Sequence, residues 1–464
     1  MKIKVRYGNY IFINVFLVFV ITFGFILFGS NEFYVEYIQA ILTLISVVFL
    51  ILHIGKIYGN IINFHSLILM SFYVFFLGRQ FTGIFGYDSY QGINYGGTYT
   101  VEDYGRAFYF SYICIVFFAA FSTINYSPER QIVNNDDAER IMYKYLKYIF
   151  WICLLPMVYY YYILISSAMI SSYGTKNYQA LIANSGYFVS LLRQWGILSL
   201  VGLVCISFIS NVNVNKTYII AYLLFTVVSL FSGGRTEGIS LLLILVLLYS
   251  EKNKGFHGKQ IGAIILIISV LFLVPYLFVI RQDITQVNNV KIANFVNSNS
   301  ILSAIHEMGG SASPLLLVQK ISEREYGKSY ILAILNTIVN FLPKSIRPDF
   351  SSIGALSLAH FFTVKLGLNY GLGFNLVAEA FYNFGVFGFG VFIIFGVLFR
   401  KVVSSGSTSL DFIIKVMFVF FMFTMARRES KDLFSAVLYY WFPFVILSYF
   451  IQKKFLVKSD NNEK

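Results

Sequence analysis

The sequence predicts an all-α integral membrane protein with about twelve membrane-spanning helices and one large loop outside the membrane. The first indication is composition. Of the 464 residues, 58% are hydrophobic and only 12% are charged, whereas a soluble domain carries about 25% charged residues. The second is the recurrence of apolar runs long enough to cross a bilayer as helices. The third is that lysine and arginine gather in short segments between these runs, as the signals that orient membrane helices do.

The apolar runs mark the expected helices in order. They lie near residues 10–28, 36–54, 61–78, 107–124, 147–166, 195–210, 217–232, 238–250, 261–280, 375–399, 411–426 and 433–451. The first run follows a basic start but has no small-residue cleavage site. We therefore expect a retained first helix and not a cleaved signal peptide.

Orientation follows from the basic clusters, which fall on one side when the N-terminus is placed inside. They are Lys2/Lys4/Arg6, Arg140/Lys144/Lys147, Lys252/Lys254/Lys259, Arg400/Lys401 and Lys453/Lys454/Lys458. We therefore expect both termini to be cytoplasmic. Because the net charge of +13 is distributed among these segments, it does not indicate nucleic-acid binding.

One segment interrupts the regular succession of helices. Residues 281–374 contain no full-length apolar run and are expected outside the membrane. The chain would thus comprise a helical bundle at 1–280, an outer loop at 281–374, and three more helices with a cytoplasmic tail at 375–464. Within the loop, Lys328–Phe341 and Ser352–Leu366 are apolar enough to lie in the membrane interface.

A second outer segment, Gly78–Arg106, is rich in glycine and tyrosine. Tyrosine offers a flat apolar face and a hydroxyl group, which suits a sugar ring. The same residue type also suits an aromatic belt at the membrane surface. Both interpretations are open.

No metal or cofactor is expected. The three cysteines, Cys114, Cys153 and Cys205, lie in apolar runs without metal-ligand spacing, which predicts buried free thiols. The sequence contains no Walker loop, no Gly-x-Ser-x-Gly elbow and no Asp-x-Asp pair. An enzyme with this sequence is therefore not expected to use a cytoplasmic nucleotide sugar as its donor.

The most informative charges are arginines on the outer side, where the orientation rule disfavours them. Arg235 lies in a polar joint between two apolar runs, and Arg281, Arg427 and Arg428 also fall at outer helix ends. Because guanidinium matches phosphate oxygens and stays charged at any relevant pH, we expect these arginines to bind a pyrophosphate or a similar anion. The alternative is snorkelling at the interface. Their local partners would then be Glu237, Glu429 and Asp432.

Four other residues are candidates for acid–base chemistry. Glu379 is the only acidic residue placed well within an apolar stretch, where a charge usually faces a cavity or a partner. It would pair with an arginine or act as a general base. His306, Glu307 and His360 lie in the long loop, and histidine can take a proton near neutral pH. A lone loop histidine is also commonly structural.

Four stretches in order make the chain resemble the Wzy-type O-antigen and capsule repeat-unit polymerases. They are Ser232–Gly238; Glu307–Ser311; Tyr326–Tyr330 leading to Phe341–Pro343; and Gly371–Gly388, which includes Ala378–Gly385. The large outer loop late in a chain of about twelve helices completes the resemblance. It covers residues 217–435, and the first 200 residues match in hydropathy alone.

The resemblance implies a glycosyltransferase of GT-C-like polymerase architecture, working on the outer face of a bacterial cytoplasmic membrane. Its donor would be a growing glycan on undecaprenyl pyrophosphate, and its acceptor a single lipid-linked repeat unit. Its protein partners would be a chain-length regulator and a flippase. The four outer arginines would bind the pyrophosphate, and Glu379 would orient one of them. His306, Glu307 or His360 would deprotonate the acceptor.

Two other functions are open at this point. Ligation of a finished glycan to a lipid acceptor is a related activity on a similar scaffold. A flippase or another secondary transporter for lipid-linked oligosaccharides would also bind pyrophosphate through arginines. It would, however, need a charged cavity open to both sides, and charges within the predicted helices are nearly absent.

Overall fold

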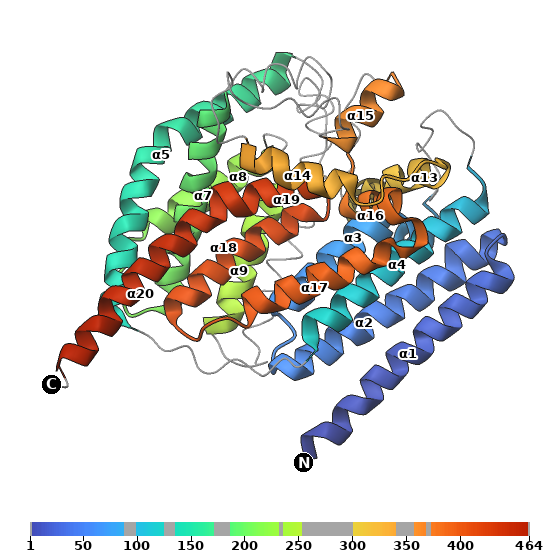
Figure 1. Cartoon of the computed structure of the whole chain (residues 1–464), viewed down its shortest axis with the longest axis horizontal. Helices are drawn as coiled ribbons and strands as arrows, with labels where there is room; N and C mark the ends of the chain where they lie inside the picture. Colours follow the sequence, from blue (N-terminus) through green and yellow to red (C-terminus); the bar gives the residue numbers. More distant parts are fainter. Residues whose placement is uncertain are drawn as a thin grey trace. The chain divides into compact units, whose positions relative to one another are not determined.

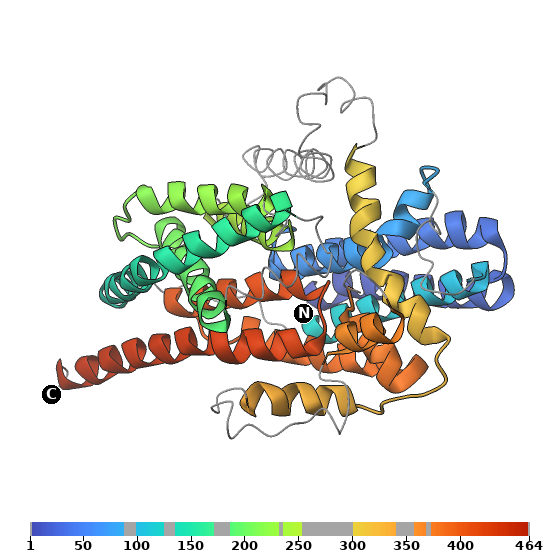
Figure 2. The same cartoon turned by 90° about the horizontal axis from the view of Figure 1, so that it is seen from above.

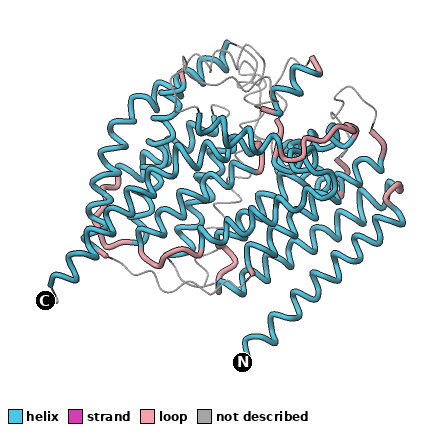
Figure 3. Tube along the Cα trace, in the orientation of Figure 1, coloured by secondary structure: helices cyan, strands magenta, loops and turns pink. Residues whose placement is uncertain are grey.

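A computed structural model of the chain describes residues 2–87, 99–124, 135–170, 186–231, 235–252, 300–339, 357–367 and 373–462. These residues form helices joined by turns, and no strand element occurs among them (Figure 3). The predicted all-α fold class is therefore confirmed for the described part of the chain.

The chain divides into two compact units, and each is described by itself. Unit 1 contains Met1–Pro128, Val296–Val403 and Met425–Asp432; unit 2 contains Glu129–Phe295, Ser404–Thr424 and Leu433–Lys464. Each unit therefore combines segments that are far apart in the sequence. The division into 1–280, 281–374 and 375–464 stays a prediction.

Unit 1 holds the first long helices and the helices of the expected outer loop. In order they are α1 (Lys2–Phe28), the π-helix η1 (Tyr34–Ile38), α2 (Gln39–Tyr58), α3 (Phe64–Gly83), α4 (Val101–Thr123), α12 (Ser300–Gly309), the 3-10 helix η3 (Gly310–Ala312), α13 (Ser313–Gln319), α14 (Lys328–Val339), α15 (Leu358–Lys365), α16 (Leu376–Phe384), the 3-10 helix η5 (Gly385–Gly388) and α17 (Phe389–Val403). The helices α1 to α4 pack in sequence order, and α17 packs against α4 (Figure 1). Seen from above, the yellow helices α12 and α13 cross the blue α3 and the cyan α4 (Figure 2).

Unit 2 is built from the helices in the middle and at the end of the chain. They are α5 (Asp136–Ile170), α7 (Tyr187–Ile209), α8 (Thr217–Phe231), α9 (Arg235–Lys252), α18 (Ser409–Met425), α19 (Ser430–Ser435), the π-helix η6 (Ala436–Trp441) and α20 (Phe442–Asn462). The boundary between the units falls near the end of α18 and again within α19. Within the unit, α5 packs along α7 and α8 packs along α9.

Six helical stretches among the described residues are long and apolar enough to cross a membrane. They are Tyr34–Tyr58, Val101–Thr123, Asp136–Ser167, Phe188–Ile209, Leu376–Val403 and Ser430–Lys454. Each coincides with one of the spans predicted from hydropathy. The total of about twelve spans stays a prediction, and the predicted span at 261–280 lies outside the described residues.

Glycines set the distance between α3 and α12. A Cβ atom added to Gly309 would clash with the backbone nitrogen of Arg79, and one added to Gly78 would lie 2.7 Å from the carbonyl oxygen of Ile305. A side chain at either position would therefore push the helices apart. Close helix approach through small residues is common in membrane proteins. The close approach of these two helices explains why the Glu307–Ser311 stretch contains glycines.

Candidate functional site

The carboxylate of Glu379 is buried in the first turn of α16 and is held by serines. Glu379 is 2% exposed. Its Oε1 atom accepts hydrogen bonds from the hydroxyl groups of Ser329 (3.1 Å) and Ser430 (2.6 Å), and Oε2 accepts one from the Ser430 N–H (2.6 Å). These donors compensate for the cost of burying the carboxylate. Among the described residues, the partners of Glu379 are thus serines and not the arginine suggested by the sequence.

Asn383, one turn after Glu379, extends these bonds to the turn before α14. Its Nδ2 atom donates to the Ser329 hydroxyl and to the carbonyl oxygen of Glu379, each at 2.8 Å. Its Oδ1 atom accepts a hydrogen bond from the N–H of Gly327 at 2.9 Å. We refer to Glu379, Asn383, Ser329 and Ser430 as the Glu379 network.

Asn375 connects a further stretch to the start of α16. Its side chain accepts a hydrogen bond from the Ala378 N–H at 2.8 Å, which caps the helix. Its Nδ2 atom donates to the carbonyl oxygen of Ser311 at 2.6 Å. Three of the four stretches that carry the resemblance therefore meet at α16. The fourth, Ser232–Gly238, belongs to unit 2.

A second buried carboxylate, Glu429, holds the start of α15. Glu429 is 6% exposed and accepts hydrogen bonds from the Ser357 hydroxyl (2.5 Å) and from the N–H groups of Leu358 (2.8 Å) and Ala359 (3.3 Å). Burial raises the pKa of Glu429, while the bond from Ser357 opposes the shift. Because Glu429 and Ser430 are adjacent, α15 and α16 are both bound to the turn that begins the last membrane helix.

Several predicted site residues gather at this turn. Arg427 and Arg428 are exposed immediately before Glu429. His360 is exposed in the first turn of α15, the helix that Glu429 caps. In unit 1 the structure therefore brings the segment with two candidate anion ligands close to one candidate base and to Glu379.

The other two candidate bases lie on α12. The Nδ1 atom of His306 is 2.9 Å from the Thr82 hydroxyl, and its ring is 5.6 Å from that of Tyr87. These contacts hold His306 against the end of α3. Glu307, the next residue, is exposed.

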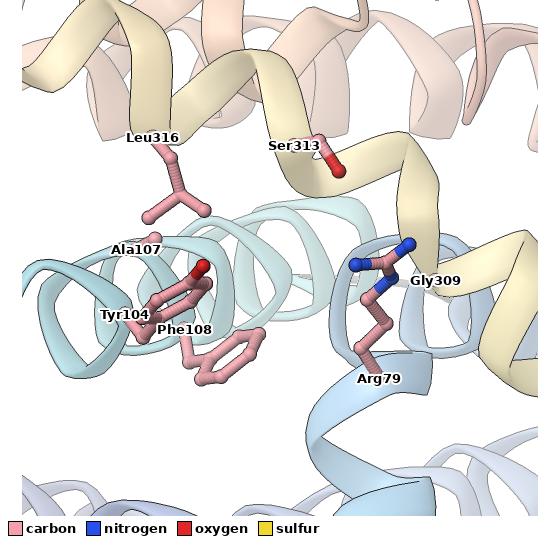
Figure 4. Close-up of a pocket in the computed structure, with 7 residues that line it drawn as sticks. All are labelled: Arg79, Tyr104, Ala107, Phe108, Gly309, Ser313 and Leu316. Atoms are coloured by element: carbon pink, nitrogen blue, oxygen red, sulfur yellow. The ribbon is translucent and has the colours of Figure 1, made fainter. Parts of the chain in front are cut away.

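A small pocket lies beside the crossing of α3 and α12 (Figure 4). It is lined by Arg79, Tyr104, Ala107, Phe108, Gly309, Ser313 and Leu316. The guanidinium group of Arg79 lies next to the chain at Gly309 (Figure 4). A Cβ atom at the following residue, Gly310, would be 3.3 Å from its Nη2 atom. Arg79 thus brings to this end of unit 1 a positive charge that was not among the candidates from the sequence.

In unit 2 the Ser232–Gly238 stretch contributes Glu237 to a buried ion pair. The Nη1 atom of Arg193, on α7, lies 2.6 Å from Oε2 and 2.9 Å from Oε1 of Glu237. The hydroxyl groups of Tyr161 and Ser229 also donate to Oε1, at 2.5 and 3.2 Å. Arg193 and Glu237 are 7% and 8% exposed. The guanidinium group also lies over the ring of Tyr160, 4.3 Å from its centre.

This ion pair changes the interpretation of the candidates in that stretch. Glu237, considered from the sequence as a partner for an outer arginine of its own joint, pairs with Arg193 of α7. Arg235 is the first residue of α9, but its side chain lies outside the described part of the structure. Arg281 falls outside the described residues altogether. The role of both as anion ligands stays a prediction.

Arg193 itself was missed because the predicted span began at residue 195. The structure starts α7 at Tyr187, which places the arginine inside a membrane helix. The available signal was the apolar segment Tyr187–Leu192 ahead of Arg193. An ionisable residue within a membrane helix indicates a buried partner.

The geometry alone does not identify the family to which the protein belongs. A family model described as O-antigen polysaccharide polymerase Wzy matches residues 10–460. The chain belongs to this family. The resemblance found at residues 217–435 is confirmed and extends through the N-terminal part. No curated protein and no solved structure matches the chain.

Family membership and the membrane helices together define the protein's class of activity. It is a multi-pass protein of the inner membrane that polymerises lipid-linked oligosaccharide repeat units. The polymerase therefore performs a glycosyltransferase-type reaction. The flippase and ligase alternatives are not favoured by this family assignment.

Proposed function

We propose that the polymerase transfers a growing glycan from undecaprenyl pyrophosphate to the terminal sugar of an incoming lipid-linked repeat unit, on the outer face of the membrane and with both chain termini in the cytoplasm. The observation that carries this proposal is that three of the four stretches that carry the family resemblance meet at α16, the helix that contains the buried Glu379. The charge distribution of the sequence supports an outer position for this end of the helices.

The reaction exchanges one bond at the anomeric carbon of the donor sugar. The bond to the pyrophosphate oxygen breaks, and a bond to the acceptor oxygen forms. The acceptor proton passes to a base, and undecaprenyl pyrophosphate leaves with the bonding electrons. Fixed positive groups stabilise the charge that develops on the leaving oxygen. The absence of an Asp-x-Asp pair from the sequence supports a metal-independent transferase in which arginines supply that charge.

Arg427 and Arg428 are the pyrophosphate ligands that the geometry of unit 1 supports best. Both are exposed, and the turn that carries them is held from within by Glu379 and Glu429. Positioning of this kind lowers the cost of ordering charged groups around a substrate. Arg235 and Arg281 are proposed as further ligands. Glu379 acts in this scheme by fixing the turn and not by pairing with an arginine.

His360 is the proposed base, with His306 and Glu307 as the alternatives. It is exposed on a helix whose start is bound to Glu429, next to the proposed arginine ligands. His306 is bound to Thr82, and Glu307 lies on the same helix. Polymerisation by His360→Gln, His306→Gln and Glu307→Gln separates these possibilities, because only replacement of the base reduces kcat with little change in KM.

Polymer formation in cells tests the proposed function. Arg235→Ala and Arg427→Ala should abolish polymer while single repeat units still reach the outer leaflet. Accumulation of lipid-linked units on the inner leaflet would identify a flippase instead. Arg235→Lys keeps the positive charge but removes the two parallel donors of the guanidinium group. Near-normal chain length in this variant would argue against a two-donor contact with phosphate. Polymerisation by the purified protein in a chelator tests metal independence, and activity that returns only with added divalent cation would contradict it.

A further inference from the structure

Tyr326 has an unusual backbone conformation. It is the only residue other than glycine with a positive φ angle in the described part of the chain, at 49°. This left-handed region is unfavourable for a residue with a side chain, and an aromatic residue seldom adopts it. The ring is not buried in return, because Tyr326 is 79% exposed. Packing of the side chain therefore does not offset the strain.

The end of α16 imposes this conformation. The N–H of Glu325 donates to the carbonyl oxygen of Tyr382 at 3.4 Å, and the N–H of Tyr326 donates to that of Asn383 at 3.0 Å. Gly327, with a φ of 88°, donates its N–H to the side chain of Asn383. Two successive left-handed residues are thus fixed by backbone and side-chain bonds. Strain that is held in this way is characteristic of functional positions.

The strained turn is part of the Glu379 network. Ser329, three residues after Tyr326, donates to Glu379, and Asn383 binds both Ser329 and the turn. The same network holds the turn at Ser430. The exposed ring is therefore presented by the elements that hold the proposed arginine ligands.

We propose that Tyr326 is a platform on which a sugar ring of the lipid-linked oligosaccharide stacks. Its flat face can pack on the C–H groups of a pyranose, and its hydroxyl can bond to a ring substituent. A fixed backbone lowers the entropy lost when the sugar binds. Lys328, exposed two residues later, offers donors for hydroxyl or acidic groups of the same sugar. The inference rests on the proposed function, because it needs the glycan to be bound at the Glu379 network.

Replacement of Tyr326 by glycine tests the role of the ring separately from the strain in the backbone. Tyr326→Gly removes the ring and relieves the positive φ angle, so the melting temperature should stay unchanged or rise. The assay uses the purified full-length protein and lipid-linked repeat units isolated from cells that lack the polymerase. KM for these units should rise about five- to tenfold, the range expected for one lost stacking contact, with a smaller change in kcat. Tyr326→Phe and Tyr326→Trp should keep most of the affinity.

Phe33 provides the matched control. It is an aromatic residue of unit 1, 63% exposed directly before η1 and outside the Glu379 network. Phe33→Ala should leave KM unchanged. A direct binding measurement uses the repeat-unit oligosaccharide released from its lipid. Saturation-transfer NMR signals from the sugar protons should appear with the wild type and be weaker with Tyr326→Gly.

The outcomes distinguish this inference from the proposed function. An unchanged KM in Tyr326→Gly overturns the platform, while wild-type polymerisation leaves the proposed function standing. A reduced amount of Tyr326→Gly in the membrane, together with an unchanged KM, would make the tyrosine an interfacial anchor and also overturn the platform. If the purified wild type does not polymerise the lipid-linked units, both proposals fail.

Discussion

Arg193 and Glu237 are bonded to one another in the interior of unit 2, with one guanidinium nitrogen 2.6 and 2.9 Å from the two carboxylate oxygens. They join α7 to the first turn of α9. Because Arg235 begins that turn, the ion pair fixes the backbone from which a proposed pyrophosphate ligand projects. A residue that was missed from the sequence thus supports one that was predicted from it.

Replacing one residue of this pair should lower the free energy of unfolding far more than replacing both. Arg193→Met leaves the Glu237 carboxylate buried without its counter-charge, and it should lower the free energy of unfolding by about 3–5 kcal/mol. The double variant Arg193→Met/Glu237→Gln should recover most of that loss. Thermal melting of the protein in detergent measures both. A double variant that is no more stable than Arg193→Met would show that the two residues are not coupled.

The exposed pair Arg106–Glu102 is the matched control for this measurement. Its side chains are 59% and 47% exposed on one face of α4. Exposed pairs of this kind contribute at most about 1 kcal/mol. Arg106→Met should therefore change the melting temperature much less than Arg193→Met.

Gly309→Ala should disrupt the packing of α12 on α3. The added Cβ atom would meet the backbone of Arg79, which cannot move aside as a flexible side chain would. We expect loss of folded protein or of polymer, measured by yield in the membrane and by chain length. Gly390→Ala is the control, because nothing lies within 4 Å of its Cβ position. Since alanine favours a helix over glycine by about 0.5–1 kcal/mol, that variant should be at least as stable as the wild type.

Substitutions at Glu379 separate positioning from base catalysis. Glu379→Gln keeps an acceptor for the Ser430 N–H, and the serine hydroxyls can turn to accept from its amide group. If Glu379 only positions the turn, this variant should retain folding and measurable polymer. Glu379→Ala leaves three buried donors without their acceptor and should be unstable, at about 1–3 kcal/mol for each unsatisfied group. A stable but inactive Glu379→Gln protein would identify the carboxylate as the base.

Stability should depend on pH through Glu429. Burial raises the pKa of this carboxyl in the folded protein above its ordinary value of 4.5, so the folded state binds the proton more tightly than the unfolded state. Its contribution to stability is fully present below the unfolded pKa and is lost as the pH rises through the folded pKa. Glu429→Gln lacks this dependence. The melting temperature of the wild type relative to Glu429→Gln should therefore fall as the pH rises from about 4 to about 8; a rise would contradict the direction of the shift.

The membrane helices were predictable because hydropathy depends on local sequence. Each of the six long apolar stretches, such as Phe188–Ile209, coincides with a predicted span. The need of Glu379 for polar partners was also predictable, since a lone carboxylate in an apolar stretch usually faces a cavity or a partner. Three of the four stretches that carry the resemblance to the family meet at α16.

The partners of these residues were not predictable, because they depend on contacts between distant parts of the chain. Ser430 lies 51 residues after Glu379, and nothing in a serine marks it as a ligand for a carboxylate. Arg193 was hidden by the placement of a helix start, which hydropathy locates only within a few residues. The conformation of Tyr326 arises from bonds to α16 and leaves no trace in its local sequence.

The position of Ser430 in the chain has a consequence for biogenesis. Glu379 is synthesised well before Ser430, whose N–H and hydroxyl group supply two of its three hydrogen bonds. Until the helix that begins at Ser430 leaves the translocon, this carboxylate must be protonated, hydrated or shielded by the insertion machinery. The proposed active site can therefore form only at the end of insertion, and a chain that stops before its last membrane helix should have no polymerase activity.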